Sequence, residues 1–334
     1  MADAMKIPVY TVYIVSGSTK YNVTPALVAI DREEDGGKIA QSVTIQLNNV
    51  QVDGSHLSSL LKARNRIFVY ANDGTKKEEV FRGYLWTRKY KSSLGDRDLQ
   101  YKCYDNLIYT QESEDSVFFS SGKSTKDVCA SMCDKWGITL KYSYESVTHG
   151  KLVLRGKLAD IFKADILDLV KERTGKKYVL RSDQDTMYIM PVGANTTIYH
   201  FIGGKNVIGT ASGWTMDGVI TKVVIVGKAD SDEREPVEAT VSGDTDQYGT
   251  LQKIIDRDSN TSLADAKMEA KNIIDEYGKP HWEYEITAPD IPWIRNGDKV
   301  YVDAGDVIGY KIVTAINRSS DSQKSEMTLT IEDP

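Results

Sequence analysis

The chain has 334 residues, of which 40% are hydrophobic and 27% charged, and a formal net charge of -6, a balance that excludes an intrinsically disordered chain. The acidic balance argues against specific nucleic-acid binding, and the lack of an apolar run of ~20 residues argues against membrane insertion. Residues 1–8 lack the charged and apolar regions of a secretory signal, so we expect the protein to be made and folded in a cytoplasm.

The first part of the chain favours β-strands. Residues 9–15 form a β-branched and aromatic run, which predicts a strand, and residues 22–30 predict a second extended segment. Residues 31–38 are acidic and contain two glycines, which is typical of a loop.

Apolar and polar side chains alternate strictly over residues 42–48. This period of two predicts a strand with Val43, Ile45 and Leu47 facing a core. Together with the strands before and after it, this pattern predicts one antiparallel β-domain over residues 1–112, either a small barrel or a sandwich.

Two stretches, residues 64–105 and residues 293–332, share one order of features. Each has an Arg-Asn pair, an apolar strand, a glycine-bearing turn, a Gly-Tyr strand, a charged hairpin and a strictly alternating strand. The pattern favours two similar β-meanders at the two ends of the chain. Few residues are identical and all hairpins alternate, so duplication and chance likeness both stay open.

The middle region, residues 113–205, has an α+β pattern. A helix is predicted from a cap at Ser124 or Thr125 to about Trp136, and a second helix over residues 162–173. The second helix is followed by two short strands at residues 178–180 and 187–190, which are joined by a polar turn.

The last region, residues 206–334, predicts a second tube-like β-domain with one inserted helix at about residues 263–277. Glycines between Gly203 and Gly213 indicate a flexible join before it. Residues 219–226 are the most apolar run and predict a central strand. The charged stretch that follows, residues 228–247, predicts either a mobile loop or an extended hairpin.

No residue pattern indicates catalysis, a cofactor or a metal. The four histidines share no ligand spacing, and no nucleophile, phosphate-binding or zinc-protease motif is present. Cys129 and Cys133 lie on one helix face and Cys103 on a strand, so all three are expected to be core residues.

The whole order of motifs resembles the XkdQ/YqbQ-type proteins of phage tails and phage-like particles, which belong with the late control protein D group of baseplate hubs. The motifs that carry this resemblance are Phe81-Arg82-Gly83-Tyr84, Tyr104-Asp105-Asn106-Leu107, Ser124-Thr125-Lys126-Asp127, Ala164-Asp165-Ile166-Leu167, Asn296-Gly297-Asp298-Lys299 and Gly309-Tyr310-Lys311-Ile312.

The resemblance implies a β-rich α+β fold in which two tube-like antiparallel β-barrel domains flank a small α+β middle region. It implies a structural, non-enzymatic role: a homotrimeric, pseudo-sixfold ring in a contractile phage tail or tailocin. The implied partners are the tail tube protein, the central spike protein, and the tape measure protein and other baseplate components. The chain would be made in the bacterial cytoplasm and assembled into the baseplate.

The sequence leaves two other function classes open. A tail-associated peptidoglycan hydrolase needs a catalytic carboxylate or Cys/His pair, and no such spacing is visible. A carbohydrate-binding β-module would need an export signal. Candidate interface residues are Tyr84, Trp86, Trp293 and Tyr310. Trp86 and Trp293 lie near corresponding edges of the two meanders and are candidate interface anchors, although a buried core position is favoured for both tryptophans.

Overall fold

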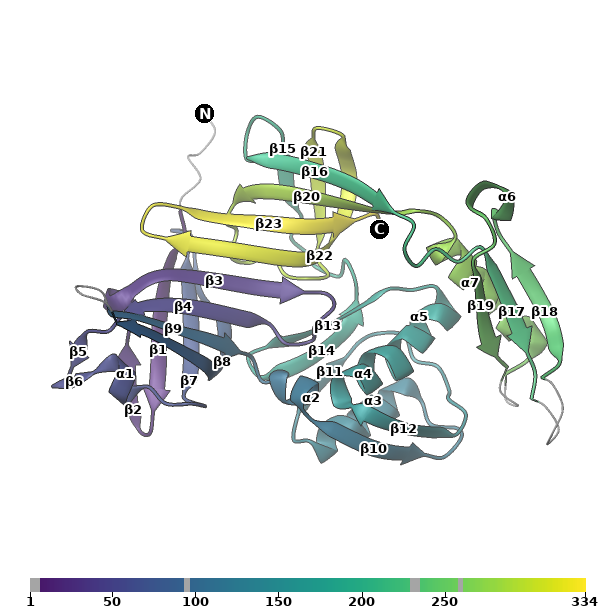
Figure 1. The fold of residues 1–334 in the computed structure, drawn as a ribbon, viewed down its shortest axis with the longest axis horizontal. Helices are drawn as coiled ribbons and strands as arrows, with labels where there is room; N and C mark the ends of the chain where they lie inside the picture. Colours follow the sequence, from purple (N-terminus) through teal and green to yellow (C-terminus); the bar gives the residue numbers. More distant parts are fainter. Residues whose placement is uncertain (1–6, 93–96, 229–234, 258–260) are drawn as a thin grey trace.

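The computed structural model describes residues 7–92, 97–228, 235–257 and 261–334 (Figure 1). One large, mainly antiparallel sheet of 13 strands runs through it, and smaller sheets and the helices lie at its side. The fold is therefore β-rich α+β, as predicted. Among the described residues, no helix is both long and apolar enough to cross a membrane.

The first half of the large sheet is built by the N-terminal strands. These are β1 (Val9–Ser16), β2 (Thr19–Asn22), β3 (Leu27–Asp35), β4 (Ser42–Asn48), β7 (Arg66–Asn72), β8 (Lys77–Ser92) and β9 (Arg97–Tyr104). A small hairpin, β5 (Gln51–Val52) and β6 (Ser55–His56), and the helical turn α1 (Leu57–Leu60) lie beside them. Val43, Ile45 and Leu47 are buried in the core of this half, which confirms the alternation seen in the sequence.

The prediction of a loop at residues 31–38 is wrong for the first half of this stretch. β3 continues to Asp35, and it carries Arg32 and Glu34 into a buried position. The extended segment predicted before it is interrupted by a short 3-10 helix, η1 (Thr24–Ala26), which contains Pro25. These charged side chains are tolerated inside because residues from the far end of the chain are their partners: Arg295 pairs with Glu34, and the carbonyl of Pro292 accepts a hydrogen bond from Arg32.

The second half of the large sheet comes from the C-terminal part of the chain. Its strands are β15 (Tyr199–Ile202), β16 (Gly209–Thr215), β20 (His281–Pro289), β21 (Lys299–Ala304), β22 (Val307–Asp321) and β23 (Ser325–Glu332). The glycine-rich join predicted up to Gly213 is therefore partly wrong, because β16 is a strand that pairs with β20. β16 is the edge strand of the sheet, and a strand at this position can contain glycine and other small, exposed residues.

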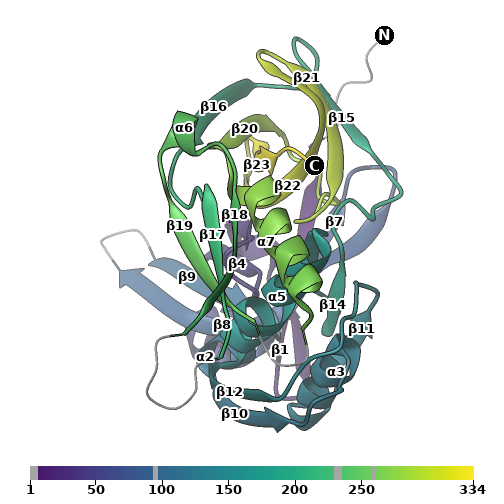
Figure 2. The same ribbon diagram turned by 90° about the vertical axis from the view of Figure 1, so that its right-hand side faces the viewer.

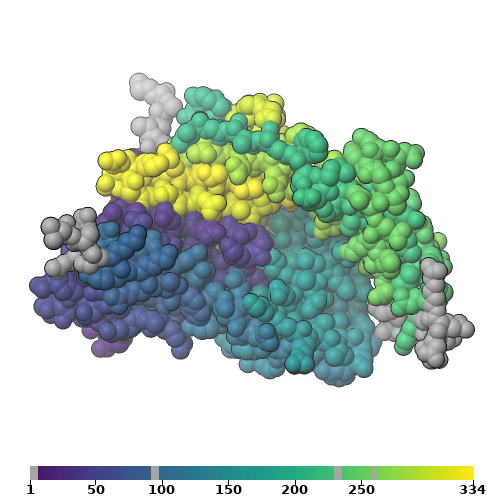
Figure 3. All heavy atoms as spheres, viewed as in Figure 1, coloured from purple at the N-terminus to yellow at the C-terminus, as the bar shows by residue number. Residues whose placement is uncertain are grey.

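The two halves have the same strand order. The first half reads β3-β4-β9-β8-β7-β1, and the second reads β16-β20-β23-β22-β21-β15. The halves join where the C-terminal part of β22 pairs antiparallel with β3. In the space-filling view the second half, in yellow, packs directly on the first half, in purple (Figure 3).

Two backbone details of the two halves also match, although the outermost pair differs, because β1 runs antiparallel to β7 and β15 runs parallel to β21. β8 bulges at Trp86, and β22 bulges at Thr314. Arg64 and Gly297 both have positive φ, and their amides donate to the carbonyls of Leu85 and Val313, respectively. Leu85 is therefore the structural equivalent of Val313. The repeat predicted from the sequence is present, but its Gly-Tyr motifs are out of register by two residues.

The middle region packs beside the first half around its own core. Its elements are α2 (Ile108–Glu112), β10 (Glu114–Phe119), α3 (Thr125–Lys135), β11 (Thr139–Tyr142), β12 (Leu152–Lys157), α4 (Leu158–Asp160), the π-helix η2 (Ile161–Leu167), α5 (Asp168–Thr174), β13 (Tyr178–Asp183) and β14 (Thr186–Pro191). Ser124 caps α3 by accepting from the Asp127 amide, as predicted. The second predicted helix starts earlier, at Leu158, and ends at Gly175, whose φ is 68°.

A small unit is inserted between β16 and β20 (Figure 2). It contains β17 (Lys222–Val226), β18 (Val237–Ser242), α6 (Thr245–Tyr248), β19 (Gln252–Asp256) and α7 (Leu263–Tyr277). α7 has the predicted bounds, and β17 is central as predicted, although in a separate three-stranded sheet. The pairing of β17 with β18 favours the extended hairpin over the mobile loop, and residues 229–234 of that stretch lie outside the described residues.

The three cysteines are buried and unpaired by disulfides, as predicted. Burial raises the pKa of Cys133 to about 12 and raises the pKa of Cys103 and Cys129 above the ordinary thiol value. Because the thiolate is the reactive form, we expect no labelling by iodoacetamide in the folded protein and full labelling in denaturant. Mass spectrometry checks this, and fast labelling of the native chain would contradict it.

Candidate functional site

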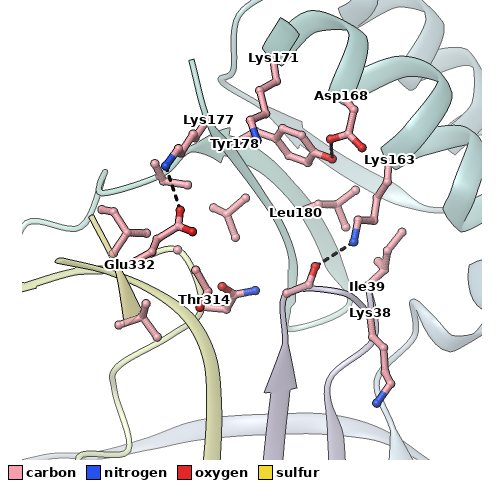
Figure 4. Close-up of a pocket in the computed structure, with 17 residues that line it drawn as sticks. Lys38, Ile39, Lys163, Asp168, Lys171, Lys177, Tyr178, Leu180, Thr314 and Glu332 are labelled. Atoms are coloured by element: carbon pink, nitrogen blue, oxygen red, sulfur yellow. Dashed lines mark hydrogen bonds and ion pairs between the residues drawn. The ribbon is translucent and has the colours of Figure 1, made fainter. Parts of the chain in front are cut away.

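A pocket of about 320 Å³ lies where the middle region meets the two halves of the large sheet (Figure 4). Lys163 donates to the carbonyls of Gly36 and Gly37 at 2.8 and 2.9 Å. Lys177 pairs with Glu332 at 3.1 Å. The charged groups of this pocket therefore connect the units to one another.

Two further polar groups of this pocket are also engaged. Tyr178 donates to Asp168 at 2.9 Å, and burial raises the pKa of its hydroxyl. Lys171 pairs with Glu276 at 3.1 Å. Across the described part of the chain, no group of three or more His, Cys, Asp or Glu residues is placed to hold a metal. The pocket's geometry supports a structural junction.

The antiparallel join between β22 and β3 is called the seam. A network of buried charged side chains lies along it. Glu34 accepts from Arg295 Nε at 2.9 Å and lies 3.6 Å from Arg318. Arg318 donates to Asp290 at 3.1 Å, and Tyr10 donates to the other oxygen of Asp290. All five side chains come from the two ends of the chain, so the network locks the two halves together.

The pKa of Glu34 records how strongly this network holds its charge. Burial by itself would raise the pKa of the carboxyl group, but Arg295 and then Arg318 outweigh it. The result is a pKa lowered from 4.5 to about 2. Glu34 is therefore ionised at neutral pH inside the seam.

The predicted interface residues do not form one patch. Trp86 is 37% exposed and packs edge-on against Tyr104 and Tyr109, and Tyr84 contacts Tyr109 in the same cluster. The side chain of Tyr84 is partly buried, and its hydroxyl accepts a hydrogen bond from Arg66 at 2.8 Å.

The other two predicted residues lie elsewhere. Trp293 packs against the core of the first half, and its indole donates to Asp73 at 2.8 Å. It therefore connects the two halves within one chain. Tyr310 is 54% exposed and packs edge-on against Tyr301 of the neighbouring strand β21.

The two ends of the halves leave strand edges without a partner among the described residues. β16 pairs only with β20, and residues 87–92 of β8 pair only with β9. Trp214 on β16 is 63% exposed and Tyr90 on β8 is 42% exposed. Sequence reasoning missed Trp214, although a lone tryptophan within a run of Gly, Ser and Thr residues was the available signal.

Comparison with known sequences decides the family. The family model described as YQBQ-like matches residues 42–332. The chain belongs to the YQBQ-like family. This confirms the resemblance seen in the motifs. A comparison with curated proteins gave no significant match.

Solved structures share the fold of this YQBQ-like chain. A tail protein from Neisseria meningitidis has a TM-score of 0.72 at 13% identity, over 97% of this chain and 96% of that one. The 43 kDa tail protein of prophage MuSo2 from Shewanella oneidensis has a TM-score of 0.69 at 13% identity, over 97% and 98%. A type VI secretion component of Escherichia coli, described as structurally similar to the bacteriophage T4 tail proteins gp27 and gp5, has a TM-score of 0.58 at 9% identity, over 92% and 74%.

These comparisons cover different parts of the molecule. The YQBQ-like match begins at the first residue of β4, so β1 to β3 lie outside it. The two tail proteins match over 97% of the chain. The fold is therefore shared over nearly the full length of the chain.

Proposed function

We propose that this chain is a structural baseplate hub of a contractile phage tail or phage-tail-like particle, where three copies form a pseudo-sixfold ring. The observation that carries this proposal is the repeated strand order of the two halves and their equivalent bulges. Three chains with two similar halves each present six similar faces, which suits an adaptor between a sixfold tube and a threefold spike.

The proposed partners follow from that geometry and from the names of the similar structures. Two are called tail proteins, and a third is described as similar to T4 tail proteins. The ring would contact the tail tube on one side and the central spike on the other, with the tape measure protein and other baseplate components nearby. It would be made in the bacterial cytoplasm and assembled into the baseplate.

In this proposal residues 1–112 and residues 206–334 together with β15 supply the two tube-like domains, and residues 113–205 apart from β15 supply the middle region. The role is geometric, with no bond made or broken. Trp86 and Tyr84 lie beside the free part of β8, so they are proposed as interface residues, whereas Trp293 stabilises the chain from within. Tyr310 is exposed and is proposed as a contact for another baseplate protein.

The ring predicts a defined mass in solution. Light scattering across a concentration series is expected to give a species close to three times 37.3 kDa, rising in fraction with concentration. A mass of 37.3 kDa at every concentration would contradict the ring. Release of soluble fragments from purified peptidoglycan would contradict the structural role.

A further inference from the structure

We infer that β8 of one subunit pairs antiparallel with β16 of the next, which repeats between chains the seam that β22 and β3 form within a chain. This inference rests on the proposed trimeric ring and specifies which surfaces close it. The occupant of each free edge is thus a second copy of this chain.

The equivalence can be followed residue by residue across each half. In the first half, one row of paired residues runs Leu85, Cys103, Val43, Arg32. In the second half, the corresponding row runs Val313, Ile331, Tyr284, Ser212. Leu85 and Val313 each precede the bulge. Therefore β3 corresponds to β16, and β8 corresponds to β22.

The seam then fixes the register between subunits. Arg318, which lies five residues after Val313, pairs with Arg32. The residue five positions after Leu85 is Tyr90, and the equivalent of Arg32 is Ser212. Tyr90 of one subunit is therefore expected opposite Ser212 of the next. The same register places Lys89 opposite Gly213.

Both strand edges are exposed to solvent, as pairing with a second chain requires. Every residue from Trp86 to Lys91 is exposed, and so is every residue from Gly209 to Gly213, followed by Trp214 at 63%. An edge strand leaves a row of backbone donors and acceptors open, which another strand can satisfy. In the seam, the equivalent side chains of Arg32, Glu34 and Arg318 are at most 5% exposed. Pairing would bury the equivalent side chains of the free edges, Ser212, Trp214 and Tyr90, in the same manner.

The side chains at the two edges complement each other. The register places Trp214 opposite Arg88, whose guanidinium already lies 5.7 Å from the ring centre of Tyr90. A guanidinium between aromatic rings is a favourable cation–π arrangement. β8 carries Arg88, Lys89 and Lys91, whereas β16 has no charged residue, so no like charges oppose one another.

A contact of this kind is heterologous, because the two edges differ. Heterologous contacts close into a ring when the rotation between subunits permits it and otherwise extend into a filament. If the seam between subunits repeats the relation of the two halves within the chain, every half meets its neighbours in the same way. Three chains then form the six equivalent positions of the proposed ring.

Engineered disulfides test the register directly. The full chain with Lys89→Cys and Gly213→Cys is expected to form disulfide-linked dimers and closed trimers under mild oxidation, and a reductant should reverse them. Opposed residues in an antiparallel pair lie about 4.5–5.5 Å apart between Cα atoms, which suits a disulfide. A Cβ atom added at position 213 would have no atom within 4 Å, and the native cysteines are buried.

Four matched variants serve as controls. Lys89→Cys with Ala211→Cys shifts the pair by two residues and should cross-link at least tenfold less. Glu33→Cys with Asn317→Cys is the equivalent pair within the chain and should give an intramolecular disulfide. Neither Lys89→Cys alone nor Gly213→Cys alone should give disulfide-linked trimers.

The outcomes separate this inference from the proposed function. A trimeric mass by light scattering without cross-linking of the in-register pair would overturn the strand pairing and leave the ring. Equal cross-linking of the Lys89→Cys variants that carry Gly213→Cys and Ala211→Cys would also overturn the register. A chain that stays monomeric and unlinked, while the pair within the chain oxidises normally, would overturn both the pairing and the ring.

Discussion

Replacing Glu34 by glutamine is expected to lower the free energy of unfolding by about 3–5 kcal/mol, because it leaves buried arginines without their counter-charge. Glu34 is 5% exposed and accepts from Arg295 through both of its oxygens at 2.9 Å. Arg318 is 3% exposed and lies 3.6 Å from it. An amide has no net charge to offset these two guanidinium groups, so the seam would open more easily.

Glu33 provides the matched control for this substitution. It is next in sequence, but its side chain is 38% exposed and it pairs with Lys38 at 3.4 Å on the surface. Because exposed ion pairs contribute little, Glu33→Gln is expected to change the unfolding free energy by less than about 1 kcal/mol. Urea unfolding followed by tryptophan fluorescence compares the two, and equal midpoints would show that the buried network is not what joins the halves.

The same network predicts the acid behaviour of the wild-type chain. The pKa of Glu34 is about 2 in the folded state and 4.5 as its ordinary value, so folding favours its ionised form. Its contribution is complete above pH ~4.5 and is lost as the pH falls toward ~2. Unfolding free energies measured across this range should fall less steeply for Glu34→Gln than for Glu33→Gln.

Local signals in the sequence were sufficient for most individual elements. Ser124 caps α3 and Ser262 caps α7, each by accepting from the amide three residues ahead. Both helices were predicted, and α3 was predicted from its cap and its apolar stripe. The alternation over β4 placed its core residues correctly. Such signals are readable because each element satisfies its own hydrogen bonds and shows its own periodicity.

Long-range pairing was not readable in the same way. The C-terminal half of β3 was expected to be a loop, because the charged residues Arg32 and Glu34 are typical of exposed positions. Their partners, which allow them to be buried, lie about 260 residues away in the sequence. β16 was expected in a flexible join because a strand at an exposed edge buries no apolar face and so shows no alternation.

The register of the internal repeat shows a further limit. The Gly-Tyr motifs at Gly83 and Gly309 were aligned by their letters, but Gly83 is equivalent to Lys311 in the structure. A strand has a side-chain period of two, so a shift by two residues preserves the whole apolar pattern. The bulges at Trp86 and Thr314 decide the register, and a bulge leaves no clear mark in one sequence.

Gly83→Ala is expected to destabilise the first half by about 3 kcal/mol or more, at the upper end of the range for forced overpacking. A Cβ atom at this position would lie 2.0 Å from the carbonyl oxygen of Tyr104 and 2.9 Å from the ring of Phe81. Tyr104 pairs with Tyr84 at the start of the β8–β9 ladder. Its backbone cannot move away without breaking pairs beside the bulge, so the cost is steric.

Gly213→Ala is the matched control, because it is also a strand glycine but has no atom within 4 Å of an added Cβ. It is expected to leave stability unchanged or to raise it by about 0.4–1 kcal/mol through the smaller entropy of the unfolded chain. Thermal and urea unfolding of both variants check this contrast. Equal midpoints would mean that β8 and β9 can separate at Gly83 at little cost. The close approach at that glycine would then not be the reason for the Phe81-Arg82-Gly83-Tyr84 motif.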